Sequence, residues 1–150
     1  MIEISEQELQ RLTRFMKKNF GIDLSRKQSL VVGRLQNLLI QRKFRSFHDF
    51  CGYVERDRTG EAAALLVNKL TTNHTYFMRE PAHFDYFAKK VLPYLVETEA
   101  KNKDLRIWSA GCSSGEEPYT LAMIIDNFFG SNEDGWDTRI LATDISTQAL

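Results

Sequence analysis

The chain has 150 residues, a formal net charge of zero and 43% hydrophobic residues, enough apolar material for a buried core. Its first residues are polar and no apolar run approaches the length of a membrane span, so we expect neither a signal peptide nor a transmembrane helix. Its two cysteines, Cys51 and Cys112, lie far apart and form no C-x-x-C motif. They are typical of free thiols in a reducing cytosol, which predicts a cytoplasmic protein.

The charge is divided unevenly along the chain. Residues 1–58 contain twelve Lys and Arg against seven Asp and Glu, a net charge of +5. Residues 59–150 contain eight against thirteen, a net charge of −5. The sequence therefore predicts an acidic partner for the first part and a cationic ligand for the second.

The N-terminal part is predicted to be a small all-α bundle. Ser5 and Glu8 have the spacing of a capping box, and the helix that they open is expected to end near Gly21. Further helices are expected at about residues 26–43, after Ser46, and at residues 61–70. Apolar residues recur at helical spacing in these segments, so each helix has one face to bury against the others.

The second of these helices has a basic face. It carries Arg26, Lys27, Arg34 and Arg42 away from the apolar stripe. Such a face can be merely solvated, can bind nucleic acid, or can dock onto an acidic protein helix. Nucleic acid is the least favoured of the three, because the net charge is modest and no aromatic residues alternate with the basic ones. Solvation and protein docking both stay open.

The connector that follows is polar and aromatic and lacks clean periodicity. Asn73, Thr75 and Arg79 place several hydrogen-bonding groups within a few residues, which is unusual for a plain linker. Pro81 is expected to start a linking helix, and Pro93 to kink it.

The stretch from Trp108 to Tyr119, WSAGCSSGEEPY, is the most informative motif of the second half of the chain. An apolar run leads into it and an apolar run of helical period follows it. We interpret this as a buried strand, a tight glycine loop and the start of a helix, as in the first half of a doubly wound fold. Gly111 and Gly115 let the backbone turn sharply and approach a ligand closely, because neither has a Cβ.

Glu116 and Glu117 fall on the first turn of that helix, and their charges indicate which kind of ligand can bind there. A dinucleotide places its pyrophosphate on a bare helix N-terminus, and two carboxylates would repel it. S-adenosylmethionine has no phosphate, and its sulfonium, ammonium and ribose hydroxyls all suit nearby carboxylates. The simpler interpretation is that both residues only complement the helix dipole.

Two other chemistries are disfavoured. Gly111 to Gly115 match the G-x-S-x-G elbow of α/β-hydrolases, but the histidine of such an enzyme would follow Ser113, and all three histidines precede it. A metal site is not predicted, because neither His74 nor His83 has a partner at ligand spacing.

Residues 139–144 are interpreted as a second strand that ends in Asp144. A carboxylate at this position of a dinucleotide-type fold accepts hydrogen bonds from ribose hydroxyls. A turn cluster at residues 130–135 explains the long spacing from Gly111. Asp144 could instead cap a following helix, but Ser146 is the better candidate for that role.

Two parallel strands alone do not make a stable open sheet, since parallel strands need cover on both faces. We therefore expect either a piece of a longer enzyme, which we favour, or two copies that complete one another as a strand-exchanged dimer. The oligomeric state is left open.

Three motifs in this order, Asn73-x-Thr75-x-Phe-Met-Arg79-Glu, Trp108 to Tyr119, and Ala-Thr-Asp144-Ile, resemble the CheR family of chemotaxis-receptor glutamate O-methyltransferases. The resemblance covers essentially the whole chain. It implies an all-α N-terminal domain followed by the start of a Rossmann-like methyltransferase domain that uses S-adenosylmethionine and releases S-adenosylhomocysteine. The expected organisation is a helical domain at 1–70, a connector and linking helix at 71–104, and the first β-α-β part of the methyltransferase domain at 105–150.

The resemblance also implies roles for individual residues. The expected cofactor-binding residues are Asn73, Thr75, Arg79, Gly111, Gly115, Glu117 and Asp144. Arg79 also borders the place where the methyl group meets its acceptor, which makes it the catalytic candidate. Arg26, Lys27, Arg34 and Arg42 become candidates for binding the cytoplasmic domain of a chemotaxis receptor, with no nucleic acid and no membrane insertion.

Two features separate this sequence from what the resemblance implies. Its glycine loop is Ala-Gly-Cys-Ser-Ser-Gly rather than the more familiar acidic-x-Gly-x-Gly-x-Gly. The later strands of the family, a downstream tyrosine near the reacting methyl group and an inserted β-subdomain have no counterpart in these residues. The alternatives are a cofactor- or receptor-binding module without turnover, and a methyltransferase that acts on RNA or a small molecule.

Overall fold

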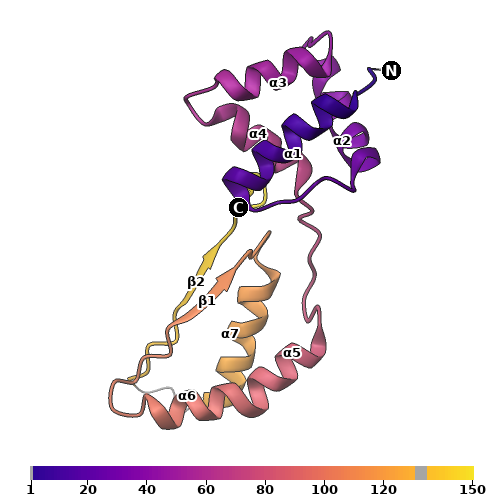
Figure 1. Cartoon of the computed structure of the whole chain (residues 1–150). Helices are drawn as coiled ribbons and strands as arrows, with labels where there is room; N and C mark the ends of the chain where they lie inside the picture. The colour runs from indigo at the N-terminus through magenta and orange to yellow at the C-terminus, as the bar shows by residue number, and fades with distance from the viewer. Residues whose placement is uncertain (1, 131–134) are drawn as a thin grey trace. The chain divides into compact units, whose positions relative to one another are not determined.

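The computed structural model describes residues 2–130 and 135–150. The chain divides into two compact units, Met1–Thr72 and Asn73–Leu150, shown in Figure 1. The central residues of the predicted turn cluster, 131–134, lie outside the described residues.

The first helix of the N-terminal unit, α1 (Glu6–Phe20), has the predicted boundaries. The Ser5 side chain accepts a hydrogen bond from the N–H of Glu8, and the Glu8 side chain accepts one from the N–H of Ser5, so the capping box is confirmed. At the other end Gly21 adopts a left-handed conformation with φ 71° and ends the helix.

The remaining helices of this unit also follow the sequence pattern. They are α2 (Gln28–Gln41), α3 (Phe47–Arg56) and α4 (Glu61–Leu70), with Ser46 as the N-cap of α3. All four helices contribute buried side chains to one apolar core, which includes Leu12, Leu35, Phe50 and Leu66. The expected all-α bundle is confirmed, because each apolar stripe is buried against the others.

The second unit begins with an extended connector and a helical segment. The segment comprises α5 (Pro81–Tyr86), a π-helical turn η1 (Phe87–Val91) and α6 (Leu92–Thr98). Pro93 was expected to kink this helix, since proline cannot donate the usual backbone hydrogen bond. The backbone hydrogen bonding widens to a π-helical turn just before Pro93, where the N–H of Leu92 donates to the carbonyl of Phe87, and the kink itself stays a prediction. The helical segment therefore continues past Pro93.

The two strands of this unit, β1 (Ile107–Ala110) and β2 (Ile140–Thr143), form a parallel pair. Ile107 pairs with Ile140 and Ala110 with Thr143. The helix that joins them, α7 (Glu116–Phe129), lies along the strands in Figure 1. These elements confirm the predicted start of an α/β domain.

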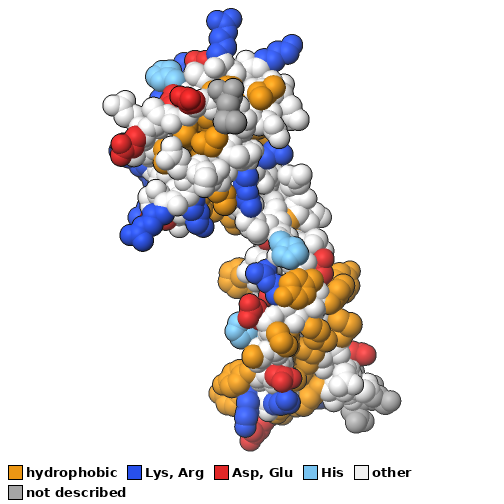
Figure 2. Space-filling model, turned by 90° about the vertical axis from the view of Figure 1, so that its right-hand side faces the viewer, with side chains coloured by type: hydrophobic (Ala, Val, Ile, Leu, Met, Phe, Trp, Pro, Cys, Tyr) orange, Lys and Arg blue, Asp and Glu red, His pale blue; other side chains and the backbone are white. Residues whose placement is uncertain are grey.

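The core of the second unit lies on one side of the strand pair. Within the described residues its buried apolar cluster consists of Leu92, Leu105, Ile125 and Phe129. Trp108 and Leu141, which pair in the sheet, are 64% and 61% exposed, so the expectation of a buried first strand is wrong for this face of the described sheet. Figure 2 shows hydrophobic side chains across the visible face of this unit, while Lys and Arg side chains project from the helical unit.

Candidate functional site

The candidate site lies at the carboxyl end of the parallel strands. The backbone N–H groups of Gly111 and Cys112 both donate to the carbonyl of Thr143, at 2.7 and 2.9 Å. These bonds hold the glycine loop after β1 against the end of β2, and so bring the loop beside Asp144. In open α/β sheets, ligands bind in the crevice outside this edge.

The two glycines of the loop are required by their backbone conformation. Gly111 has φ 93°, and Gly115, the N-cap of α7, has φ 105°. Residues with a Cβ rarely adopt such angles. A Cβ added to Gly111 would meet no atom within 4 Å, so the loop backbone is open to a ligand there.

Glu116 and Glu117 are adjacent in sequence but have different partners. Glu117 Oε1 accepts a hydrogen bond from Ser109 Oγ at 2.6 Å, and Ser109 is a buried residue of β1. Glu116 Oε2 accepts one from the exposed Ser114 at 2.7 Å. Glu117 is therefore the carboxylate that is turned toward the strand end, a distinction that sequence position alone does not provide.

Asp144 is anchored through both of its carboxylate oxygens. Oδ1 accepts a hydrogen bond from the N–H of Ser146 at 2.7 Å, and Oδ2 accepts one from the N–H of Ser113 at 2.8 Å. Ser146, a candidate helix cap from the sequence, is followed by a turn in which the N–H of Ala149 donates to its carbonyl at 3.1 Å, and its role as a cap stays a prediction. Asp144 itself closes the local turn with its side chain.

The connector joins the site through Asn73. Ser113 Oγ donates to the backbone carbonyl of Asn73 at 2.6 Å, and Asn73 Nδ2 donates to Ser146 Oγ at 2.9 Å. Asn73 was expected at the site from the sequence, whereas Ser113 and Ser146 were considered there only for other roles. The only available signal was that small polar residues occupy the loops at the two strand ends, which is common in loops of any function.

Thr75 and Arg79 lie further along the connector. Thr75 is half-buried, whereas Arg79 is exposed and donates from Nη1 to the carbonyl of His74 at 2.7 Å. The residues on either side of Arg79, Met78 and Glu80, have φ values of 59° and 60°. Left-handed backbone at non-glycine residues is uncommon and is enriched at functional sites.

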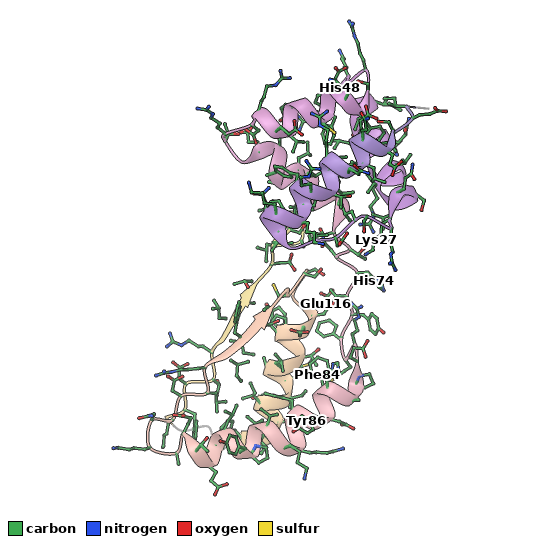
Figure 3. All side chains as sticks on the ribbon, in the orientation of Figure 1. Lys27, His48, His74, Phe84, Tyr86 and Glu116 are labelled. Atoms are coloured by element: carbon green, nitrogen blue, oxygen red, sulfur yellow. The ribbon has the colours of Figure 1, made fainter. Side chains whose placement is uncertain are left out.

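A backbone hydrogen bond ties this part of the connector to α7. The N–H of Met78 donates to the hydroxyl of the buried Thr120 at 3.3 Å. Figure 3 shows the connector, with His74, running past the end of α7 that carries Glu116. Strand ends, glycine loop and connector thus belong to one arrangement within the second unit.

The four basic residues of α2 lie in the helical unit and differ in their surroundings. Arg26, Lys27 and Arg42 are exposed. Arg34 is half-buried, and its guanidinium donates to the carbonyl of Thr71 at 2.5 Å and to the hydroxyl of Thr72 at 2.9 Å. Arg34 therefore also fastens the end of the unit to α2.

Two searches of the described residues bear on the type of site. Residues 2–130 and 135–150 contain no group of three or more His, Cys, Asp or Glu side chains arranged to hold a metal ion. Within the same ranges, no helix is both long and apolar enough to span a bilayer.

The carboxylates of the site suit a cationic ligand with hydroxyl groups. Glu117 and Asp144 take part in no ion pair within the described part of the chain, so no described Lys or Arg neutralises their charge by direct pairing. Carboxylates accept hydrogen bonds from ribose hydroxyls and attract ammonium or sulfonium groups. A pyrophosphate would meet their repulsion. The residues present therefore fit S-adenosylmethionine and disfavour a dinucleotide.

Comparisons with known proteins agree with this geometry. Residues 7–71 match the family model described as CheR methyltransferase, all-alpha domain, and residues 73–150 match CheR methyltransferase, SAM binding domain. The second match identifies S-adenosylmethionine as the cofactor of this part of the chain.

Curated relatives extend the comparison. A "Chemotaxis protein methyltransferase" of Borreliella burgdorferi is 43% identical over 99% of this chain and 54% of its own length. "Chemotaxis protein methyltransferase 1" of Pseudomonas aeruginosa is 38% identical over 91% of this chain and 50% of its own length. A relative from Listeria monocytogenes is 35% identical over 100% of this chain and 55% of its own length. The chain spans about half the length of these relatives, and it belongs to the CheR methyltransferase family.

Proposed function

We propose that the protein transfers a methyl group from S-adenosylmethionine to glutamate side chains on the cytoplasmic helices of chemotaxis receptors, giving glutamate methyl esters. The family match and the names of the relatives support methyl transfer in chemotaxis. The observation that carries the site is the pair of carboxylates, Glu117 and Asp144, at the strand ends, neither of which forms an ion pair among the described residues.

Each residue of the site has a distinct task in this proposal. Glu117 and Asp144 hold the cationic and hydroxyl groups of the cofactor, Asn73 and Thr75 supply further polar contacts, and Gly111 lets the backbone approach. S-adenosylmethionine supplies an electrophilic methyl group when bound. The acceptor glutamate is ionised at neutral pH, so the protein needs no general base. Its task is to align the acceptor oxygen and to exclude water, which is catalysis by proximity and orientation.

Arg79 is the candidate for aligning the acceptor. Its bond to the carbonyl of His74 engages one of the five N–H donors of a guanidinium and leaves others for a carboxylate. Left-handed backbone at Met78 and Glu80 flanks Arg79 on both sides, a conformation that is enriched at functional sites. A strong grip on the carboxylate would weaken it as a nucleophile, so we assign Arg79 to orientation.

The N-terminal end of α2 is the candidate surface for an acidic receptor helix. Lys27 is the N-cap and makes no side-chain capping bond, and the first turn contains no acidic residue. Unpaired N–H groups and the helix dipole favour negative charge there, and the exposed Arg26 and Lys27 add to it. Arg42 is exposed beyond the other end of the helix. Arg34 contributes less in this proposal, because its guanidinium already holds Thr71 and Thr72.

The reaction is tested by incubating the protein with purified receptor cytoplasmic domain and radiolabelled S-adenosylmethionine. Label that enters the receptor and is released by mild base identifies a glutamate ester. Label that resists base, or that enters RNA or a small molecule instead, would reject the receptor substrate. Cofactor binding without any transfer would indicate a binding module.

Two sets of variants assign the residues. Arg79→Ala is expected to lower methyl transfer by about a hundredfold with much less change in cofactor affinity, since a misplaced reactant costs rate rather than binding. Equal losses in transfer and binding would reject the orienting role.

The double variant Arg26→Ala with Lys27→Ala tests docking at α2. It is expected to weaken receptor binding and to reduce the dependence of that binding on salt, with cofactor affinity unchanged. An unaltered salt dependence would reject docking at α2.

A further inference from the structure

A closed ring of hydrogen bonds links three segments of the site, and we call it the strand-end ring. Its members are Asn73, Ser113, Asp144 and Ser146. Ser113 joins Asn73 through its hydroxyl and Asp144 through its backbone N–H. Ser146 joins Asp144 through its backbone N–H and Asn73 through its hydroxyl. The connector, the glycine loop and the segment after β2 are therefore fixed to one another by side chains.

The backbone conformation at Ser113 indicates that its side chain has a task of its own. Ser113 has φ 50°, in the left-handed region where a Cβ is disfavoured and glycine is not. Its side chain is buried, with the residue 7% exposed. Backbone strain alone would favour glycine at this position. The hydroxyl bond to Asn73 is what serine provides there and glycine does not.

Ser146 fixes the orientation of the Asn73 amide. Ser146 is 0% exposed, and a buried hydroxyl is costly unless it is hydrogen-bonded. It accepts from Nδ2 of Asn73, which directs the amide nitrogen to Ser146 and leaves the amide oxygen on the other side of the group. The same two serines hold the carboxylate of Asp144 through their backbone N–H groups.

We propose that Ser113 and Ser146 are positioning residues for S-adenosylmethionine, holding Asn73 and Asp144 in the binding arrangement before the cofactor arrives. A site that is ordered in advance loses less conformational entropy on binding, so affinity rises without any added contact. The inference rests on the proposed function in one respect, the contact of Asn73 and Asp144 with the cofactor.

The decisive variant is Ser113→Gly, because it removes the hydroxyl while relieving the backbone strain. The thermal midpoint of the ligand-free protein is expected to change little, because the relieved backbone strain offsets the lost hydrogen bond. The dissociation constant for S-adenosylhomocysteine is expected to rise about threefold to tenfold, the effect of one lost hydrogen bond. A merely structural serine would give unchanged affinity. Ser114→Ala is the matched control, since Ser114 is an exposed serine of the same loop and bonds outside the ring.

A double variant tests whether both serines act through Asn73. Ser146→Ala alone is expected to weaken S-adenosylhomocysteine binding by a similar factor. Ser113→Gly with Ser146→Ala should cost clearly less than the product of the two single effects, because the ring is already open after the first change. Calorimetric titration measures all four proteins.

The outcomes separate this inference from the function itself. If the unaltered protein binds S-adenosylhomocysteine and Ser113→Gly binds it equally well, the positioning role is overturned and the proposed function stands. If the two substitutions raised the dissociation constant independently, so that their factors multiplied in the double variant, the joint action of the two serines through Asn73 would also be overturned. If the unaltered protein does not bind S-adenosylhomocysteine, the proposed function is overturned and the positioning role falls with it.

Discussion

Each of the two units is stabilised internally, and the kind of interaction that stabilises it differs between them. The helical unit encloses an apolar core to which α1, α2, α3 and α4 all contribute, including the fully buried Met16, Phe47 and Phe50. Among the described residues of the second unit the buried apolar cluster is much smaller, and Trp108 and Leu141 remain exposed. Side-chain packing thus dominates the first unit.

In the second unit, polar side chains make many of the contacts between segments, whereas apolar side chains make them in the first unit. Hydrogen bonds of buried or half-buried serine, asparagine and aspartate residues join the strand ends, the glycine loop and the connector. Hydrogen bonds contribute little net stability each but impose direction, which apolar contacts do not. The apolar core of the first unit therefore mainly provides stability, whereas the hydrogen bonds of the second unit mainly fix the positions of a few polar groups.

The largest expected effect is on the helical core. Phe50→Ala should lower the free energy of unfolding of the helical unit by about 3–5 kcal/mol, because it leaves a cavity in a closed core. Urea denaturation followed by circular dichroism measures the change. Ile40→Ala, at a residue that is 59% exposed in α2, is the control and should stay within about 0.5 kcal/mol. If Phe50→Ala lost affinity for S-adenosylhomocysteine at temperatures where the protein stays folded, the separation of core stability in one unit from ligand binding in the other would be contradicted.

The second prediction concerns a carboxylate of the site. Glu117→Gln should raise the dissociation constant for S-adenosylmethionine about tenfold to a hundredfold, because a hydrogen bond to a charged group is worth about 1.5–3 kcal/mol. Calorimetric titration measures it. Asp126→Asn, at an exposed carboxylate of the same helix, is the matched control. Equal effects of the two substitutions would show that only the net charge of α7 matters.

The third prediction separates two arginines of α2. Arg34→Ala should lower the free energy of unfolding of the helical unit by about 1–2 kcal/mol, because Thr71 and Thr72 lose a charged hydrogen-bond donor. Arg26→Ala, at an exposed residue, should leave it within about 0.5 kcal/mol. Equal stabilities of the two variants would mean that the contacts of Arg34 with the end of its unit contribute nothing.

The smallest expected effect is a pH dependence in the helical unit. The guanidinium of Arg11 donates to both oxygens of Glu55, at 2.9 and 2.7 Å, and lowers the pKa of that carboxyl below its ordinary value of 4.5. A lowered pKa means that the stabilisation is present above pH 4.5 and is lost as the pH falls through the folded-state pKa. The pair is partly exposed, with side chains 29% and 46% accessible, so its contribution is at most about 1 kcal/mol.

Comparison of the protein with Glu55→Gln isolates this contribution from the other carboxylates. The difference in their free energies of unfolding should be largest near pH 6 and should shrink toward pH 3. A difference that grows on acidification would contradict the assignment, because it would require a raised pKa.

Local rules were sufficient for most of the secondary structure. The capping box at Ser5 and Glu8, the N-cap at Ser46 and the glycine that ends α1 each act through residues a few positions away, so sequence predicts them directly. The effect of Pro93 was not predictable in the same way. The helical segment contains a wider, π-helical turn just before Pro93, and the spacing of residues in the sequence does not distinguish such a turn from a regular one.

Part of the candidate site was also visible in the sequence. Gly111, Gly115 and Asp144 were recognisable because the strand–loop–helix pattern fixes where a parallel sheet presents its ligand-binding edge. Ser113 and Ser146 were not, because their partners lie 40 and 73 positions away from them, both at Asn73. No periodicity or spacing in a single sequence records such contacts.

The amino-acid sequence by itself determined the helices, the order of the two strands, the family and the kind of ligand that the charge of the second unit favours. These follow from short-range backbone preferences and from which residues are apolar or charged. The tertiary structure alone decided that Glu117 rather than Glu116 turns to the strand end, that Arg34 holds the end of its own unit, and that two serines close a ring around Asn73. Hydrogen bonds are directional and short, so their partners are known only when distant segments have been brought together.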